Sequence, residues 1–201
     1  DFIFPYSQGL EFVQALYDRG GYASIDAAFL NPPQSTEQIL HPQLYPQELP
    51  LDLQLPDYLA LLGDNWEEID RNSLGEWYWF LLLNQPVQAD WALAQKDAQQ
   101  AAAGWGGDQY AVYYNAQTDQ AALIALSEWD SVAEADEFWA AFTRYAQDRW
   151  GKAQQKSGNK IVWEGNDQAV ILSRQGSQVL WVQTPSLSSA QALAKTLPDF
   201  P

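Results

Sequence analysis

The alternation of short apolar runs with polar turns after Asp108 is the feature that most limits how this chain can fold. Residues 110–114 and 121–129 predict a hairpin around the polar turn 115–120, because apolar runs bounded by turn residues are typical of strands. Ser131 then opens a helical pattern with an apolar stripe. Further strands are predicted at 160–164, 169–173 and 178–183. This order predicts an α+β fold in which an antiparallel sheet of about five strands carries helices on one face.

The first half of the chain shows helical signals instead. Apolar residues recur at helical spacing from Leu10 to Tyr17, and a second short helix is predicted before Pro32. Ser35 followed by Gln38 is a capping-box pattern that predicts a third short helix.

These textures divide the chain into two predicted regions. Residues 1–104 form a mostly helical region that includes an extended, Pro- and Leu-rich arm over 42–62. Residues 105–201 form an α+β region built on the antiparallel sheet.

Composition excludes several classes of protein. The chain has 26 acidic and 10 basic residues and a net charge of −16, so binding to nucleic acid or to an anionic membrane surface is disfavoured. Cysteine is absent and His41 is the single histidine, so thiolate metal sites and zinc sites with two histidines cannot form within this chain. We therefore expect no catalytic residues, no metal site and no catalytic activity from this chain alone.

Three acidic patterns were weighed as sites. Glu37 and His41 lie four residues apart and share one helix face, but two ligands do not make a zinc site, so a surface pair is expected. The acidic run 64–70 lacks the oxygen and glycine positions of a calcium-binding EF-hand loop and predicts a solvated turn before a helix. The carboxylates within 128–137 crowd a helix N-terminus, where the helix dipole favours them.

A succession of spaced motifs resembles the C-terminal half of a poorly characterised family of secreted or surface proteins of bacteria and archaea. The motifs are Pro5-Tyr6, Gly9, Phe12-Val13, Leu16-Tyr17, Gly20-Gly21, Pro32-Pro33, Ser35 to Pro42, Leu74-Gly75-Glu76 and Gly104 to Tyr110. In that family an upstream His-Glu-x-x-His helix resembles a gluzincin-type zinc metallopeptidase. This chain has no such helix, so zinc is expected only if a segment before Asp1 supplies the ligands. Because the chain begins without methionine, we expect a processed form or a part of a longer protein.

Two functions are expected, the first from this resemblance and the second from the absence of a self-sufficient set of catalytic residues. In the first, the chain is the non-catalytic C-terminal part of an extracytoplasmic metallopeptidase-like protein and supports or shapes a substrate cleft. The resemblance then implies cleft or binding residues at Ser35, Thr36, Glu37, Gln38 and His41. In the second, the chain is a stand-alone acidic subunit without enzymatic activity that docks to a partner protein with a basic surface. Both expectations name a protein or peptide partner, and neither involves nucleic acid or a transmembrane segment.

Overall fold

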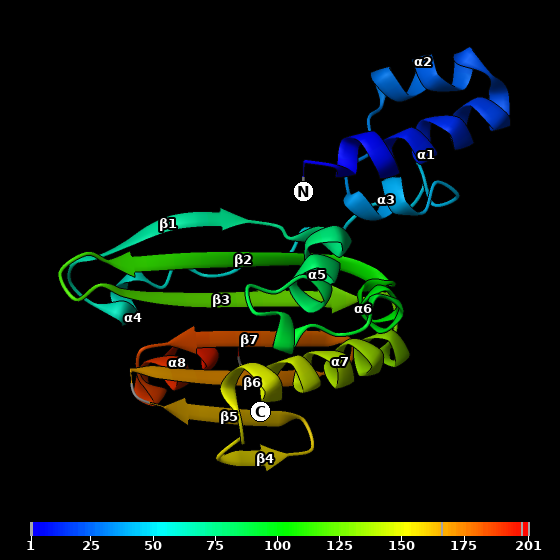
Figure 1. The fold of residues 1–201 in the computed structure, drawn as a ribbon. Coiled ribbons are helices and arrows are strands. Elements are labelled where there is room, and N and C mark those ends of the chain that lie inside the picture. Colours follow the sequence, from blue (N-terminus) through cyan, green and yellow to red (C-terminus); the bar gives the residue numbers. More distant parts are fainter. Residues whose placement is uncertain (1, 166, 198, 201) are drawn as a thin grey trace.

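The computed structural model describes residues 2–165, 167–197 and 199–200, and its centre is a seven-stranded antiparallel sheet (Figure 1). The order of the strands across the sheet is β1-β2-β3-β7-β6-β5-β4. Their bounds are β1 Trp66–Asn72, β2 Trp105–Asn115, β3 Gln120–Trp129, β4 Gln155–Ser157, β5 Lys160–Gly165, β6 Gln168–Gln175 and β7 Gln178–Thr184. The long β2–β3 hairpin and the β5–β6–β7 meander meet where β3 pairs with β7, with Ala125 opposite Trp181.

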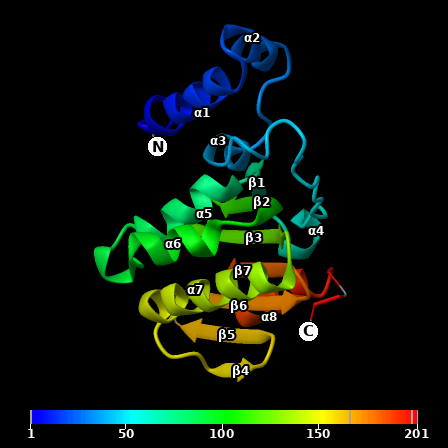
Figure 2. The ribbon, with the colours of Figure 1, turned by 90° about the vertical axis from the view of Figure 1, so that its right-hand side faces the viewer.

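Eight α-helices and one 3-10 helix surround the sheet within the described residues. They are α1 Phe4–Gly20, α2 Tyr22–Leu30, α3 Thr36–Leu40, α4 Leu59–Leu62, α5 Gly75–Asn84, the 3-10 helix Ala89–Trp91, α6 Gln95–Ala102, α7 Val132–Trp150 and α8 Leu187–Ala194. Figures 1 and 2 show α1 and α2 projecting away from the sheet, and α1 contacts α5 through Phe4, whose ring centroid lies 4.7 Å from that of Trp77. Helices α1 and α2 therefore form an N-terminal arm attached to an α+β body, and this arm is distinct from the extended arm over 42–62.

The prediction of about five strands is wrong, because the sheet gains β1 and β4 at its two edges. Strand β1 comes from the acidic run that was predicted to be a solvated turn, and most of its side chains are exposed. Strand β4 has three residues, all exposed. Edge strands of this kind bury neither face, so the alternating apolar pattern that reveals a strand in a sequence is missing.

The expected placement of helices on one face of the sheet is also wrong. Helices α5, α6 and α7 cover one face, where the Phe138 and Trp129 rings stack with centroids 4.2 Å apart. Helix α8 and the segment around Tyr58 cover the other face and bury a second apolar cluster. The apolar run of β6 is continuous over 169–172 because its successive side chains enter these two clusters in turn.

The N-terminal half is helical only in part, because β1 lies within it. This strand pairs with β2 from Trp66 opposite Asn115 to Asn72 opposite Tyr110. The sheet thus crosses the predicted boundary between residues 104 and 105, and the division into two regions stays a prediction. Four residues of those regions, Asp1, Asn166, Pro198 and Pro201, lie outside the described residues.

Candidate functional site

Three motifs that lie far apart in the sequence meet where the arm joins the body. Helix α3 packs against the start of α5, and the backbone N–H of Trp77 donates a hydrogen bond to Thr36 Oγ1 at 3.2 Å. One turn of α3 further on, His41 Nε2 lies 2.9 Å from Glu76 Oε1. Because both bonds link α3 to the first turn of α5, they set the position of the arm on the body.

The start of α5 is itself held by Asp108 of β2. This buried carboxylate accepts hydrogen bonds from Ser73 Oγ at 2.5 Å, from the backbone N–H groups of Leu74 and Gly75, and from Trp105 Nε1 at 3.2 Å. Burial raises the pKa of Asp108, and these donors oppose the rise because they favour the charged form. Asp108 therefore ties α5 to β2 and is fully occupied in doing so.

Four of the five predicted cleft residues are used in the same junction. Ser35 Oγ accepts a hydrogen bond from the backbone N–H of Gln38 at 3.1 Å, which is the predicted helix cap. The Gln38 side chain donates to a backbone carbonyl of the extended arm, while Thr36 and His41 contact α5. These four residues position α3, and none of the described residues donates a hydrogen bond to the carboxylate of the fifth, Glu37.

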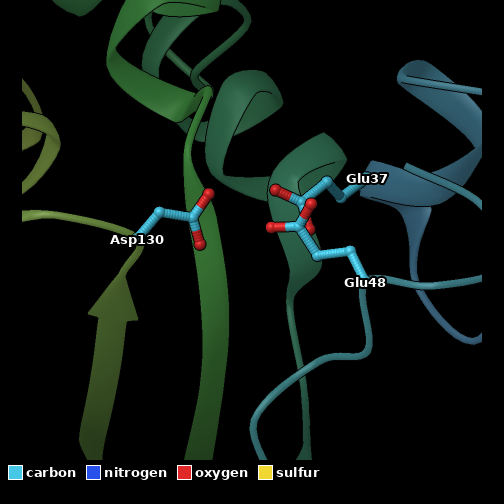
Figure 3. Close-up of side chains that lie close together, drawn as sticks. All are labelled: Glu37, Glu48 and Asp130. Atoms are coloured by element: carbon cyan, nitrogen blue, oxygen red, sulfur yellow. The ribbon is translucent and has the colours of Figure 1, made fainter. Parts of the chain in front are cut away.

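Glu37 instead faces two other carboxylates. Ligand atoms of Glu37, Glu48 and Asp130 all lie within 4.8 Å of one another, and we call this set the carboxylate cluster (Figure 3). Glu37 comes from α3 and is 3% exposed, Glu48 comes from the extended arm and is half-buried, and Asp130 follows β3 and is exposed. The cluster is thus closed by Glu37 on the inside and open to solvent at Asp130.

The electrostatics of the cluster are unfavourable to a charged Glu37. Burial raises the pKa of Glu37 to about 8, and the negative charges of Asp130, Glu76, Glu48 and Glu134 add to the rise. An isolated carboxylate is ordinarily ionised near neutral pH, so this group is held neutral unless a positive charge joins it.

In the neighbouring His41–Glu76 pair, only one of the two carboxylate oxygens of Glu76 has a hydrogen-bond partner among the described residues. The hydrogen bond to Glu76 raises the pKa of His41, and burial raises the pKa of Glu76 against the opposing effect of His41. Glu76 Oε1 contacts the imidazole, but Oε2 is buried without a hydrogen-bond partner among the described residues. The predicted Glu37–His41 pair is thus replaced by a His41–Glu76 pair, because His41 ends α3 and turns toward α5.

The glycine-rich start of β2 allows the extended arm to approach the cluster. A Cβ atom on Gly107 would lie 2.6 Å from the backbone oxygen of Leu51, which is closer than real contacts allow. The arm pairs there through a hydrogen bond from the Leu51 N–H to the Gly106 carbonyl at 2.8 Å. Side chains at Gly107 would push away the segment that carries Glu48.

An open cleft of about 490 Å³ lies beside this junction, between the extended arm and strands β1 and β2. Its polar groups include Arg71 and Asp108. Arg71 donates to Glu68, to backbone carbonyls of the extended arm and to Tyr113, so its guanidinium is already bound on several sides. Arg71 and Asp108 are therefore committed to structural contacts, and the exposed Asp52 is a further carboxylate in the lining of the cleft.

Helix α1 carries a second apolar face that is largely exposed among the described residues. Phe12 and Leu16 are buried beside Tyr45, as a core-facing helix requires. The stripe formed by Tyr6, Leu10, Val13 and Tyr17, spaced at helical intervals, is 42 to 81% exposed. We call these four residues the α1 stripe.

The α1 stripe borders an apolar groove between α1 and α2. The groove has a volume of about 240 Å³ and is lined by Phe12, Val13, Leu16, Ile25, Ala28, Phe29, Pro32 and Pro33. Phe29 is 82% exposed at its edge. Exposed apolar surface that is contiguous in this way is characteristic of interaction sites.

Helices α1 and α2 carry more acidic than basic residues. Glu11, Asp18 and Asp26 are exposed on α1 and α2. The one basic residue of these helices, Arg19, donates to the backbone carbonyls of Pro42 and Tyr45. The groove is thus apolar, and the two helices that form it are acidic overall.

Sequence reasoning missed Glu48 and Asp130 as neighbours of Glu37, and Glu76 as the partner of His41. Asp130 was grouped with the carboxylates of a helix N-terminus, and Glu48 lies in an arm without any period. Only the resemblance, which placed 35–42, 74–76 and 104–110 in one motif set, pointed to segments that meet here. Spacing along the chain carries no signal for contacts made by tertiary packing.

A comparison with known families assigns most of the α+β body to one of them. Residues 61–194 match the family described as Domain of unknown function (DUF8575). The chain belongs to this family. The DUF8575 match runs from within α4 to the end of α8 and includes Glu76 and Asp130, whereas Glu37 and Glu48 precede it.

The other comparisons add no relative. Neither the curated proteins nor the solved structures include a match to this chain. Within the described ranges, every helix is too short or too polar to cross a bilayer.

Proposed function

We propose that this chain works by binding protein, as the non-catalytic C-terminal part of an extracytoplasmic metallopeptidase-like protein. The observation that carries the binding role is the α1 stripe with its groove, which leaves several large apolar side chains in water. A helix that must remain in solution usually shows one apolar face, which packs on its own core. The second face of α1 is explained when another polypeptide covers it.

The occupant of the groove is a protein segment that presents apolar side chains flanked by lysine or arginine. The apolar lining selects the former. The excess of acidic residues on α1 and α2, which carry Glu11, Asp18 and Asp26 against Arg19, favours the latter. An apolar helix laid into a groove is a common mode of peptide recognition. The charges add to the rate and specificity of association more than to its final affinity.

The resemblance supplies the identity of that segment. In the resembling family a zinc-binding helix lies upstream of the motifs found here, so the proposed occupant is that upstream segment. The junction of α3 with α5 then supports the substrate cleft of the catalytic segment from one side. Ser35, Thr36, Gln38 and His41 act in this scheme by positioning α3, because their side chains are engaged in the junction.

The docking surface is tested with an amphipathic helical peptide of leucine and lysine as the probe. We expect it to bind the whole chain in isothermal titration calorimetry and to slow amide hydrogen exchange in α1 and α2. A Leu10→Ser/Val13→Ser double variant should lose at least tenfold in affinity, because it removes apolar area from the α1 stripe. The matched control is a Val87→Ser variant, which alters an exposed valine on the body.

The result is judged against charge alone. A leucine–glutamate peptide of the same pattern should bind at least tenfold more weakly. Equal binding of the lysine peptide to the double variant and to the control would overturn the proposal, because it would show attraction to net charge only. A dimer in sedimentation velocity that the double variant abolishes would also overturn it, because a second copy would then occupy the stripe.

A stand-alone acidic subunit is the alternative source of the same docking surface. The intact mass of the natively purified protein, read against the gene before Asp1, separates the two. An encoded His-Glu-x-x-His segment assigns the occupant to the same polypeptide. Its absence assigns the surface to a separate partner with a basic face, whose binding weakens as salt rises.

A further inference from the structure

We propose that the carboxylates of Glu37, Glu48 and Asp130 form a site for one calcium ion. This inference does not depend on the docking role, because it uses other residues. The three side chains come from α3, from the extended arm and from the turn after β3, so an ion among them would bind three separate parts of the chain together (Figure 3).

The geometry of the carboxylate cluster fits a single ion. Two oxygens that coordinate one calcium ion at about 2.4 Å can lie at most about 4.8 Å apart. The ligand atoms of the cluster all lie within 4.8 Å of one another. In Figure 3 the carboxylates of Glu37 and Glu48 lie side by side and that of Asp130 points toward them across a short gap.

An almost fully buried side chain without a hydrogen-bond partner gives a second indication of a ligand. Glu37 is 3% exposed, and no donor among the described residues reaches its carboxylate. Glu76, 5% exposed, has one buried carboxylate oxygen that also lacks a partner. Buried carboxylates are normally paired or bound to metal, because desolvation of a lone charge is costly.

The chemistry of the cluster selects a hard cation. Its members offer carboxylate oxygens only, and the nearby imidazole of His41 is engaged with Glu76. Oxygen ligands suit calcium, magnesium and manganese rather than zinc. Calcium tolerates irregular geometry and mixed protein and water ligands, which suits three carboxylates from unrelated elements with an open side at Asp130.

Binding of the ion would lock the arm to the body. Glu37 belongs to α3, on which α1 packs, and Asp130 belongs to the connection between β3 and α7. Without a cation, the same contact places negative charges from both parts together, and protonation of Glu37 is the competing way to relieve the repulsion. The ion would therefore control how firmly α1 and α2 are presented.

Calcium chloride added to the whole, chelator-treated chain at pH 8 tests the proposal by calorimetry and thermal unfolding. We expect one ion per chain and a rise in Tm of roughly 5–10 °C at calcium about 100-fold above Kd. Glu37→Gln and Asp130→Asn should each weaken calcium binding at least tenfold. Glu137→Gln, an exposed carboxylate on α7, is the matched control and should bind as the parent does.

A proton readout identifies Glu37 as a ligand. At pH 7 a group with a pKa of about 8 is mostly protonated, so calcium binding should release about one proton per ion, measured from the buffer dependence of the heat. The release should disappear in Glu37→Gln. Asp130 is exposed, so its variant keeps the test valid if the Glu37 variant unfolds.

Three outcomes would overturn the proposal. The first is no heat and no Tm shift with millimolar calcium, which would leave the proton as the occupant. The second is a Tm shift of equal size in the control and in both cluster variants, which would indicate general screening of an acidic chain. The third is tighter binding of magnesium than of calcium, which would assign a different ion.

Discussion

At the scale of a single residue, the unfavourable electrostatics of the junction fall on the Glu37 carboxylate. The side chains of Thr36 and Gln38 in α3 have hydrogen-bond partners, whereas the Glu37 carboxylate meets Glu48 and Asp130. A neutral Glu37 is compatible with this environment and an ionised one is not, unless a cation is present. The residue thus links protonation, cation binding and the position of the arm.

The stability of the chain without calcium should fall as pH rises from about 5 to 8. The pKa of Glu37 is raised by burial to about 8, and the unfolded chain has the ordinary value of 4.5. Stabilisation from the protonated group is complete below the unfolded pKa and is lost as pH rises through the folded one. His41, whose pKa is raised by its hydrogen bond to Glu76, acts in the same direction above its ordinary value of 6.5.

Chemical denaturation across this pH range measures the effect. Glu37→Gln should flatten the fall and make the chain more stable at pH 8, whereas the exposed Glu137→Gln should leave the pH profile unchanged. A Glu37→Gln profile as steep as that of the parent would show that other groups dominate.

At the scale of elements, the junction between α3 and α5 depends on close approach of the Thr36 side chain to the backbone of α5. Gly75, the first residue of α5, has a φ of 69°, and a Cβ there would lie 2.6 Å from Thr36 Oγ1. The same hydroxyl accepts a hydrogen bond from the Trp77 N–H. A side chain at this point would therefore separate the two helices as well as strain the backbone.

Gly75→Ala should destabilise the chain more than Gly151→Ala does. Gly151 has a similar φ of 75° after α7, but no atom lies within 4 Å of its added Cβ. Gly151→Ala should cost only the strain of a backbone with φ 75° and ψ −150°, about 1–3 kcal/mol. Gly75→Ala should cost about 1–3 kcal/mol more, because overpacking adds to that strain. Equal losses in urea unfolding would mean that α3 does not pack on α5 as described.

At the scale of the whole molecule, the sheet and the N-terminal arm of α1 and α2 differ in how much apolar surface they bury. Strands β3, β6 and β7 are paired on both sides, and the sheet is covered by apolar clusters on both faces. Helices α1 and α2 contribute a small cluster around Phe12, Leu16 and Tyr45 and leave the α1 stripe exposed. The arm is therefore the less stable part.

Amide hydrogen exchange should follow this division. We expect α1 and α2 to exchange at least tenfold faster than β3, β6 and β7, because local opening of the arm exposes little new apolar surface. The exchange is measured by mass spectrometry on the whole chain at pH 7. Protection of α1 equal to that of β7 would contradict the description of α1 and α2 as a weakly held arm.

The features that sequence alone determined are local ones. The Ser131 cap of α7 accepts a hydrogen bond from the Glu134 N–H, and Ser35 caps α3 in the same way. Such bonds join residues three apart, and a hairpin such as β2–β3 needs only its turn and two apolar runs, so the chain itself specifies them. The resemblance to a metallopeptidase-like family, and the function inferred from it, remain predictions.

Tertiary structure alone decided the edges of the sheet, its second covered face and the carboxylate cluster. Strand β1 becomes a strand only by pairing with β2, because its own side chains are mostly exposed. The continuous apolar run at 169–172 was a signal for burial on both faces, but it does not say what covers them. Glu37, Glu48 and Asp130 meet only because packing joins α3, the extended arm and β3. No local sequence pattern records a contact between residues so far apart.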